Sequence, residues 1–262
     1  MAHLFLISTG PGDDGLLSPA ARRALEESSE WVGYSLYFSL LGDLAVGKNR
    51  HELPLGAETE RARVALSLAA AGHPTALISS GDIGIYAMAT LVFELLDPAN
   101  RDENFDPDWL QVSIETIPGI SAMQAAASRC GAVLGHDFCT VSLSDLLTPW
   151  EVITNRLEHA AAGDFVVCFY NPVSRKRDWQ LNYARDQLLK YRSQDTPVIL
   201  GRNLTRDDER ITFCALSELD ASEVDMLTLV IVGNSETRRF INEYDGCEWI
   251  YTPRGYKTKS RR

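Results

Sequence analysis

The sequence predicts an α/β protein made of two domains. Short apolar runs alternate with amphipathic helical patterns along the whole chain, which is typical of α/β folds. Glycine-rich turns follow directly on several of the apolar runs, as they do where strands end at a ligand site. The chain has 262 residues, of which 45% are hydrophobic, so it is long and apolar enough for two cores.

The first half of the chain is predicted to form an N-terminal α/β domain over residues 1–118. A buried strand at 3–9 is followed by a helix that Ser18 caps, with Pro19 at its first position. The remaining predicted elements are strands at 31–34, 76–80 and 112–117, and helices at 59–71 and 86–96. We place the domain boundary near Pro118, where the pattern restarts.

The second half is predicted to form a C-terminal α/β domain over residues 119–256, followed by a basic tail at 257–262. The predicted helices lie at 121–130, 149–162 and 177–191, and the strands at 138–143, 165–170, 197–202, 211–216 and 227–233. The last three strands follow one another with no helix between them, so we expect a mixed sheet.

Charge and cysteine usage exclude several functions. The net charge of −11 argues against nucleic acid or an anionic membrane as the main partner. No apolar stretch is long enough to cross a bilayer. The five cysteines form no CxxC pair, and Cys139, Cys168 and Cys214 lie in apolar, strand-like runs. We therefore expect these three to be buried free thiols, with no metal site and a cytoplasmic location.

Three small-residue turns are the candidate binding elements. The first contains Gly10, Pro11, Gly12 and Asp13, and the second, at 79–86, contains Gly81-Asp82. The third is 118–122, which opens a helix with small residues and leaves free amides at its start. Each has a purely structural alternative: a plain strand-to-helix turn, or an Asp that caps the next helix. Neither a P-loop nor a GxGxxG motif is present.

Taken together, these turns resemble those of the tetrapyrrole methylase family. The family shares a GPGD turn, a GDPxxY-like turn and a PGxSA segment, and this chain has GPGD at 10–13, GDIGIY at 81–86 and PGISA at 118–122. Within the family, VSLSDLLTPW at 141–150, FYNPVS at 169–174 and TPRGY at 252–256 are similar to the branch that methylates carbon 17 of precorrin-3B or its cobalt form. One departure is Ile83, where the family usually has proline.

The resemblance implies two α/β domains with S-adenosylmethionine in the cleft between them. The positions that match the family's cofactor-binding segments are Ser80, Gly81, Asp82, Ile85, Tyr86, Ser121, Ala122, Asn171, Leu204 and Thr228. The GPGD turn, with Gly10, Pro11 and Gly12, is expected to face the tetrapyrrole. The implied reaction methylates carbon 17 and contracts the ring, and family members are usually homodimers.

Ring contraction moves protons, so a general acid or base is expected to help. Asp13 is the first candidate because it ends the substrate-facing turn; Asp145 and His136 are alternatives, and Ser144 is able to donate a hydrogen bond. The structural alternative is that either Asp caps a turn and that His136 lies in an exposed loop.

Arginine side chains suit the carboxylates on the rim of this substrate class, because the guanidinium pairs with carboxylate through two hydrogen bonds. Arg175 and Arg254 lie beside the family-like strings and are the substrate-binding candidates. Arg177 and Arg206 also follow predicted strand ends, but their pattern is more typical of solvated surface residues.

Three other functions compete with this interpretation. The first is methylation at another position of a precorrin or uroporphyrinogen, against which the SLSDLLTPW string argues. The second is a nucleotide-dependent oxidoreductase, which the absence of GxGxxG disfavours. The third is a corrinoid carrier without enzymatic activity, which would bind the tetrapyrrole without consuming the methyl donor.

Overall fold

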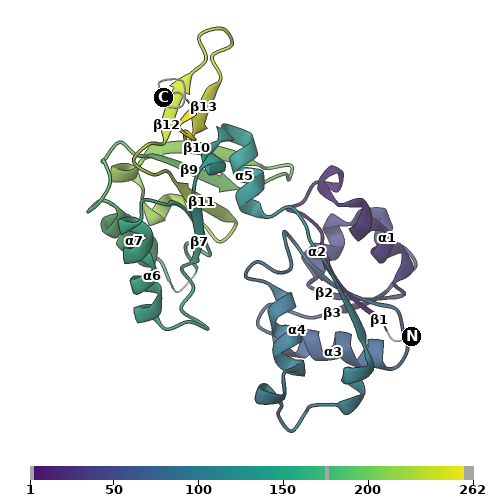
Figure 1. Ribbon diagram of the computed structural model, residues 1–262. Helices are drawn as coiled ribbons and strands as arrows, with labels where there is room; N and C mark the ends of the chain where they lie inside the picture. The colour runs from purple at the N-terminus through teal and green to yellow at the C-terminus, as the bar shows by residue number, and fades with distance from the viewer. Residues whose placement is uncertain (1–2, 175–176, 257–262) are drawn as a thin grey trace. The chain divides into compact units, whose positions relative to one another are not determined.

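The computed structural model describes residues 3–174 and 177–256. The chain divides into two compact units, Met1–Ala122 and Met123–Arg262, which we call the N-terminal and the C-terminal unit. Both alternate strands with helices, which confirms the predicted α/β class (Figure 1).

The N-terminal unit is built on a five-stranded sheet in the order β3-β2-β4-β1-β5, with every neighbouring pair parallel. Its strands are β1 (His3–Ser8), β2 (Glu30–Gly33), β3 (Asn49–Glu52), β4 (Thr75–Ser79) and β5 (Ser113–Ile117). Because all strands run in one direction, their carboxyl ends meet at one edge of the sheet, and the turns that follow β1, β4 and β5 become neighbours.

Helices cover both faces of this sheet (Figure 1). They are α1 (Pro19–Glu27), α2 (Ser35–Leu40), α3 (Glu58–Ala70) and α4 (Met88–Leu96). Alternate residues of β1 point to opposite faces: Leu4 and Leu6 pack with α3 and α4, and Phe5 and Ile7 with α1 and α2. The continuous apolar run of β1 is therefore that of a strand buried on both sides.

Helix capping and backbone conformation explain which predicted helices of the N-terminal unit are observed and where their bounds differ from the prediction. Ser18 Oγ accepts a hydrogen bond from Ala21 N at 3.1 Å, so α1 is capped as predicted. The helix predicted from residue 86 begins at Met88, because Tyr86 has a φ of 52°, which no α-helix contains. Helix α2 was not predicted, and neither was the polar edge strand β3, because Asn49–Glu52 carries no apolar signal.

The C-terminal unit contains a five-stranded sheet in the order β10-β9-β11-β8-β7. Its strands are β7 (Phe138–Ser142), β8 (Val166–Tyr170), β9 (Pro197–Arg202), β10 (Arg210–Ala215) and β11 (Thr228–Val232). The sheet is mixed: β7 and β8 are parallel, while β11 is antiparallel to both β8 and β9. The ends of β7, β8 and β9 therefore lie at the same edge as the start of β11.

Helices again lie on both faces of this sheet. They are α5 (Ala122–Cys130), α6 (Trp150–Ala162) and α7 (Gln180–Leu188), the last shorter than the predicted 177–191. Helices α6 and α7 pack against one face, which includes Val167 and Phe169. On the opposite face α5 approaches the sheet closely: a Cβ at Gly201 would lie 3.3 Å from the Cβ of Ala126.

A small three-stranded sheet, not predicted from the sequence, completes the C-terminal unit. It has the order β12-β13-β6, formed by β12 (Arg238–Ile241), β13 (Glu248–Tyr251) and β6 (Gly131–Ala132). The hairpin of β12 and β13 projects from the unit (Figure 1). Short 3-10 helices elsewhere in the chain lie at Asp14–Leu16, Gly42–Ala45, Pro98–Asn100, Pro107–Gln111, Val133–Gly135, Leu216–Glu218 and Ala221–Glu223.

The structure shows how buried the cysteines are, whether any helix is suited to a membrane, and whether metal-ligating side chains cluster. Cys168 is a buried free thiol as predicted, and Cys130 is buried too, whereas Cys139 and Cys214 are only partly buried. Burial raises the pKa of Cys130 and of Cys168 to about 12, so both stay protonated at neutral pH. Among the helices of the described residues, none has the length and apolarity that a membrane span requires. Residues 3–174 and 177–256 also contain no group of three or more His, Cys, Asp or Glu side chains placed to hold a metal ion.

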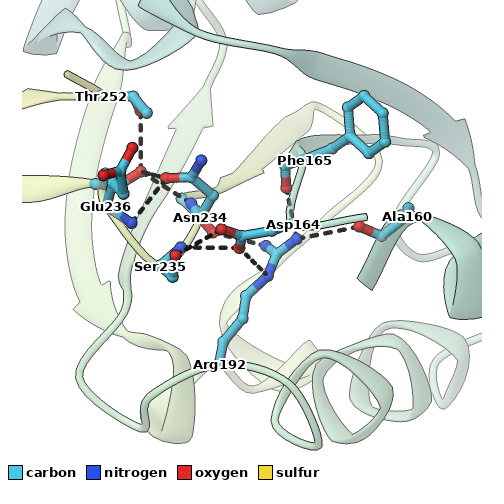
Figure 2. A network of polar contacts seen from close by, with 10 residues as sticks. Ala160, Asp164, Phe165, Arg192, Asn234, Ser235, Glu236 and Thr252 are labelled. Atoms are coloured by element: carbon cyan, nitrogen blue, oxygen red, sulfur yellow. Dashed lines mark hydrogen bonds and ion pairs between the residues drawn. The ribbon is translucent and has the colours of Figure 1, made fainter. Parts of the chain in front are cut away.

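A buried arginine ties several segments of the C-terminal unit together (Figure 2). The Arg192 side chain is fully buried and donates to the carbonyl oxygens of Gly233 at 2.6 Å and Phe165 at 2.5 Å. Its nearest carboxylate is that of Asp164, at 3.9 Å, which also accepts hydrogen bonds from Ser235. Burial lowers the pKa of this guanidinium, and Asp164 opposes that shift. The network joins the loop before β8 to the end of β11.

Replacing Arg192 is expected to destabilise the protein strongly. Arg192→Leu removes the donors and leaves buried carbonyl oxygens unpaired, so we expect a loss of about 3 kcal/mol or more in the free energy of unfolding. Arg156→Leu, an exposed position on α6, is the matched control and is expected to change stability by less than about 0.5 kcal/mol. Urea unfolding measures both; equal midpoints for the two variants would show that the network contributes nothing.

Candidate functional site

The first two glycine turns of the N-terminal unit are joined directly through their backbones. Gly10 N donates to Gly81 O at 3.1 Å, and Gly81 N donates to Gly10 O at 2.7 Å. The two residues have φ values of 73° and 70°, which favour glycine. The turns after β1 and β4 therefore form one structure at the carboxyl edge of the sheet.

Asp82 joins the second turn to the third. One carboxylate oxygen accepts from Gly84 N at 2.8 Å, and the other accepts from Gly119 N at 3.0 Å. Asp82 therefore stabilises its own turn but does not cap the next helix, because α4 has Ala87 at its N-cap and no side-chain hydrogen bond there. It also holds the segment 118–122 against the second turn, so the two segments predicted to bind the cofactor lie side by side.

Gly119 lies where two turns meet with no space for a side chain. A Cβ at this position would be 2.5 Å from the Cβ of Ser8 and 2.8 Å from Gly81 O. At Gly81 the opposite holds, because a Cβ there would meet no atom within 4 Å. The backbone of Gly81 thus borders open space, which is what a turn needs if a ligand is to approach the main chain closely.

Ile83 shows how this turn differs from the family pattern. Its side chain is buried in the core with α3 and α4, and its N–H donates to Ser8 Oγ at 2.9 Å. Proline has no N–H and could not make this bond. Sequence reasoning missed Ser8, which ends an apolar strand and carries no signal of its own.

The other predicted residues of this edge are placed as follows. Ser80 Oγ donates to Gly10 O at 3.3 Å, and Ile85 N donates to Asp82 O at 3.1 Å. Tyr86 is exposed with its unusual φ of 52°, whereas Ser121 is buried. Ala122 is half-buried and begins α5.

The GPGD turn leads into a short 3-10 helix that Asp13 caps. Asp13 is exposed, and its carboxylate accepts from Gly15 N at 2.7 Å. Pro11 is buried and Gly12 half-buried. A pocket of about 360 Å³ lies beside this turn, lined by residues 15–19 and 118–120. The pocket is therefore lined by the residues that follow the GPGD turn and by the third turn, while residues 10–13 do not line it.

The predicted residues of the C-terminal unit gather at one edge of its sheet. Asn171 follows β8, Leu204 follows β9, and Thr228 begins β11, where it pairs with Arg202. Thr228 Oγ1 donates to a carboxylate oxygen of Asp225 at 2.7 Å, and Leu204 is buried against Gly201. Three segments distant in sequence thus become neighbours because β8 and β9 run in the same direction on either side of β11.

Unusual backbone conformations concentrate at this edge. Asn171, Asn203 and Thr205 have φ values of 50°, 46° and 63°. Asparagine adopts this region at modest cost, but a β-branched residue such as Thr205 does so rarely. Backbone strain of this kind persists where the surrounding structure holds it, often at ligand sites. It marks the loops after β8 and β9 as candidates for binding.

Arg177 anchors the loops after β7 and β8 and is not a surface residue. Its side chain is 8% exposed and donates to Leu143 O at 2.8 Å and Asn171 O at 2.7 Å. Its Nε lies 3.7 Å from a carboxylate oxygen of Asp145. Burial lowers the pKa of Arg177, and Asp145 opposes that shift. The interpretation of Arg177 as a solvated residue was wrong, because the sequence does not show the carbonyl groups that it binds.

The remaining candidates do not all share this edge. Ser144 is half-buried and its N–H donates to Ser142 Oγ at 3.3 Å. His136 is half-buried and accepts a hydrogen bond from Asp137 N at 2.8 Å. Arg206 is half-buried in the loop after β9, and Arg254 is exposed after β13 of the small sheet. Arg175 and the tail 257–262 lie outside the described residues.

Two α/β units whose cofactor-binding candidates lie at the ends of sheet strands are typical of proteins that bind a nucleotide or a cofactor. A family model described as Tetrapyrrole (Corrin/Porphyrin) Methylases matches residues 3–220, and the chain belongs to this family. Methylases of this family use S-adenosylmethionine, so the chain is an S-adenosylmethionine-dependent methyltransferase.

Individual relatives agree with this assignment. A Sinorhizobium sp protein named precorrin-3B C(17)-methyltransferase is 42% identical and covers 98% of each chain. A Priestia megaterium protein named cobalt-factor III methyltransferase is 44% identical over 98% of this chain, which spans 45% of that longer protein. The crystal structure of the methyltransferase CobJ is 37% identical, with a TM-score of 0.86 over 95% of this chain and 99% of that one. The resemblance seen in the sequence is confirmed.

The role of Asp82 in joining two turns is testable by removing one acceptor. Asp82→Asn replaces one carboxylate oxygen with an NH₂ group that cannot accept, so we expect a loss of about 1–2 kcal/mol in the free energy of unfolding. Asp106→Asn is the matched control, because Asp106 Oδ1 accepts from Asp108 N and an amide oxygen can replace it. Urea unfolding measures the free energy of unfolding of both variants. An equal, small loss in both would show that the Asp82–Gly119 hydrogen bond does not stabilise the protein.

Proposed function

We propose that the protein transfers a methyl group from S-adenosylmethionine to carbon 17 of precorrin-3B, or of its cobalt form, with contraction of the ring. The observation that carries this proposal is the 42% identity to the Sinorhizobium precorrin-3B C(17)-methyltransferase over 98% of both chains. The VSLSDLLTPW, FYNPVS and TPRGY strings support the same position on the ring. Methylation at another position of a precorrin or uroporphyrinogen is the less favoured alternative.

The residues present suit a methyl donor that needs alignment rather than activation. When bound, S-adenosylmethionine supplies a methyl group on a positively charged sulfur. Gly81 borders open space, and Asp82 holds the second and third turns together beside it. We propose that these turns bind the donor together with Ser80, Ile85, Tyr86, Ser121 and Ala122 of the same unit. Asn171, Leu204 and Thr228 are the proposed contributions of the C-terminal unit.

Fixed turns of this kind contribute to catalysis by orientation. A rigid backbone that holds two reactants in line supplies much of the rate acceleration of a group transfer. The exchanged hydrogen bonds of Gly10 and Gly81 make the donor-binding turn and the substrate-facing turn one rigid structure. Gly10, Pro11 and Gly12 are the proposed substrate-facing residues, with Arg175 and Arg254 pairing with carboxylates on the rim.

Proton movements during ring contraction are assigned to Asp13, Asp145 and Ser144. Asp13 is exposed at the end of the GPGD turn, with its carboxylate already positioned by Gly15 N. Asp145 lies near Arg177, with one of its carboxylate oxygens 3.7 Å from Arg177 Nε. A carboxylate is a chemically suitable general base, so Asp13 and Asp145 are the proposed bases, and Ser144 is the proposed hydrogen-bond donor.

We further propose a cytoplasmic homodimer with an N-terminal domain over 1–118, a C-terminal domain over 119–256 and a basic tail at 257–262. Free thiols whose pKa burial raises, such as Cys168, support a reducing compartment. The tetrapyrrole is the proposed partner, and the charge of −11 disfavours nucleic acid and anionic membranes.

The proposal is tested by turnover. The protein is expected to convert precorrin-3B or cobalt-factor III, with labelled S-adenosylmethionine, into a tetramethylated product and S-adenosylhomocysteine, identified by mass spectrometry and NMR. Product methylated at a carbon other than 17 would favour the alternative. Tetrapyrrole binding without S-adenosylhomocysteine formation would identify a carrier, and stabilisation by NADH instead of the methyl donor would identify an oxidoreductase.

The role of Arg254 is tested by separating the two ligands. Arg254→Ala is expected to weaken tetrapyrrole binding about tenfold, because a charge-assisted pair is lost, and to leave the affinity for S-adenosylmethionine unchanged. Arg156→Ala, also exposed, is expected to change neither affinity. Calorimetric titration measures both ligands; loss of both affinities, or of neither, would remove Arg254 from the substrate site.

A further inference from the structure

The segment between β7 and α6, residues 143–149, carries two residues that the proposed function does not yet use. It contains the SLSDLL part of the string that is most specific to this branch, and it begins at the edge where Asn171 and Thr228 lie. Ser144 and Asp145 have proposed roles in it. Leu146 and Leu147 follow them directly.

Both ends of this segment are fixed. At its start, Leu143 is fully buried, its N–H donates to Tyr170 O at 3.0 Å, and its carbonyl accepts from Arg177. At its end, the Trp150 ring packs against the rings of Trp179 and Tyr183, with centroids 4.8 and 5.4 Å away. The two leucines therefore lie on a short segment that is held at its base and at its exit.

The leucine side chains themselves are almost fully exposed. Leu146 is 86% and Leu147 98% exposed, more than any other aliphatic side chain among the exposed hydrophobics of the described residues. Neither contributes to a core, so neither is needed to stabilise the fold. Adjacent exposed apolar side chains beside a candidate site are characteristic of a surface that binds an apolar ligand.

The occupant that this position favours is the tetrapyrrole. A macrocycle of this class presents broad apolar faces, with its carboxylates at the rim. The leucines continue directly from Asp145, which Arg177 holds, and they lie in a loop at the same edge as the donor-binding candidates of this unit. A donor of methyl groups must be brought against one face of the ring, where water would interfere with the transfer.

We propose that Leu146 and Leu147 contact the apolar face of the tetrapyrrole and determine its affinity. This inference rests on the proposed function and deepens it by assigning the substrate-binding surface of the C-terminal unit. The base of the loop, held by Arg177, positions the leucines, and their side chains exclude water from the ring. The affinity for S-adenosylmethionine does not depend on them.

The test is a double variant, Leu146→Ser with Leu147→Ser. We expect the dissociation constant for cobalt-factor III, measured by absorbance titration, to rise at least about tenfold, because apolar contact area is lost. The dissociation constant for S-adenosylmethionine and the melting temperature are expected to be unchanged, since both side chains are exposed. The double variant Leu146→Met with Leu147→Met keeps the apolar area and is expected to bind normally.

A matched control uses exposed apolar residues elsewhere. Val46→Ser with Leu110→Ser changes two exposed side chains that precede β3 and β5, away from the strand ends that carry the candidate residues. Its tetrapyrrole affinity is expected to equal that of the wild-type protein. An equal loss in both double variants would show a general surface effect and overturn the inference.

Four further results would overturn the assignment of Leu146 and Leu147 to the tetrapyrrole surface. Unchanged tetrapyrrole affinity in Leu146→Ser with Leu147→Ser, while the wild-type protein turns over the substrate, overturns this inference alone. A change of molar mass in light scattering would assign the leucines to a subunit interface instead, and a lower melting temperature would assign them to the fold. If the wild-type protein binds no tetrapyrrole, the proposed function fails, and the inference fails with it.

Discussion

The carboxylate of Asp82 is the contact on which the N-terminal edge depends. It accepts one hydrogen bond from its own turn, at Gly84, and one from the start of the third turn, at Gly119. The exchanged bonds between Gly10 and Gly81 add the first turn to the same structure. Three loops that a parallel sheet merely brings near each other are thereby made into one surface, with the backbone of Gly81 left accessible.

Arg177 holds together the loops at the edge of the C-terminal sheet, as Asp82 does in the N-terminal unit, but it donates hydrogen bonds where Asp82 accepts them. A buried cation donates to the carbonyl oxygens of Leu143 and Asn171, so the loops after β7 and β8 are held by their acceptors, whereas Asp82 holds loops by their donors. Each residue satisfies backbone groups that strand ends leave unpaired. Methyl transfer depends mainly on fixed geometry, and the hydrogen bonds of Asp82 and Arg177 hold the loops at these two edges in place.

The family and the fold class were predictable because they depend on local patterns. Apolar runs such as Leu4–Ile7, the Ser18-Pro19 helix start and the GPGD, GDIGIY and PGISA strings are readable in order along the chain. Elements without a local signal were missed: the polar edge strand β3, and the small sheet of β6, β12 and β13, whose strands are short or exposed. Arg177 was misinterpreted because its partners are carbonyl oxygens, which every residue has.

The sequence alone determined which turns exist, which residues they contain and which family they belong to, because glycine, proline and aspartate act on the backbone within a few residues. Tertiary structure alone decided which of these turns touch. Strand order and direction bring Asp82 to Gly119 and the N–H of Ile83 to Ser8 Oγ. They also place Thr228, at the start of β11, beside the ends of β8 and β9. Those properties arise from packing between segments far apart in the chain, which no local pattern records.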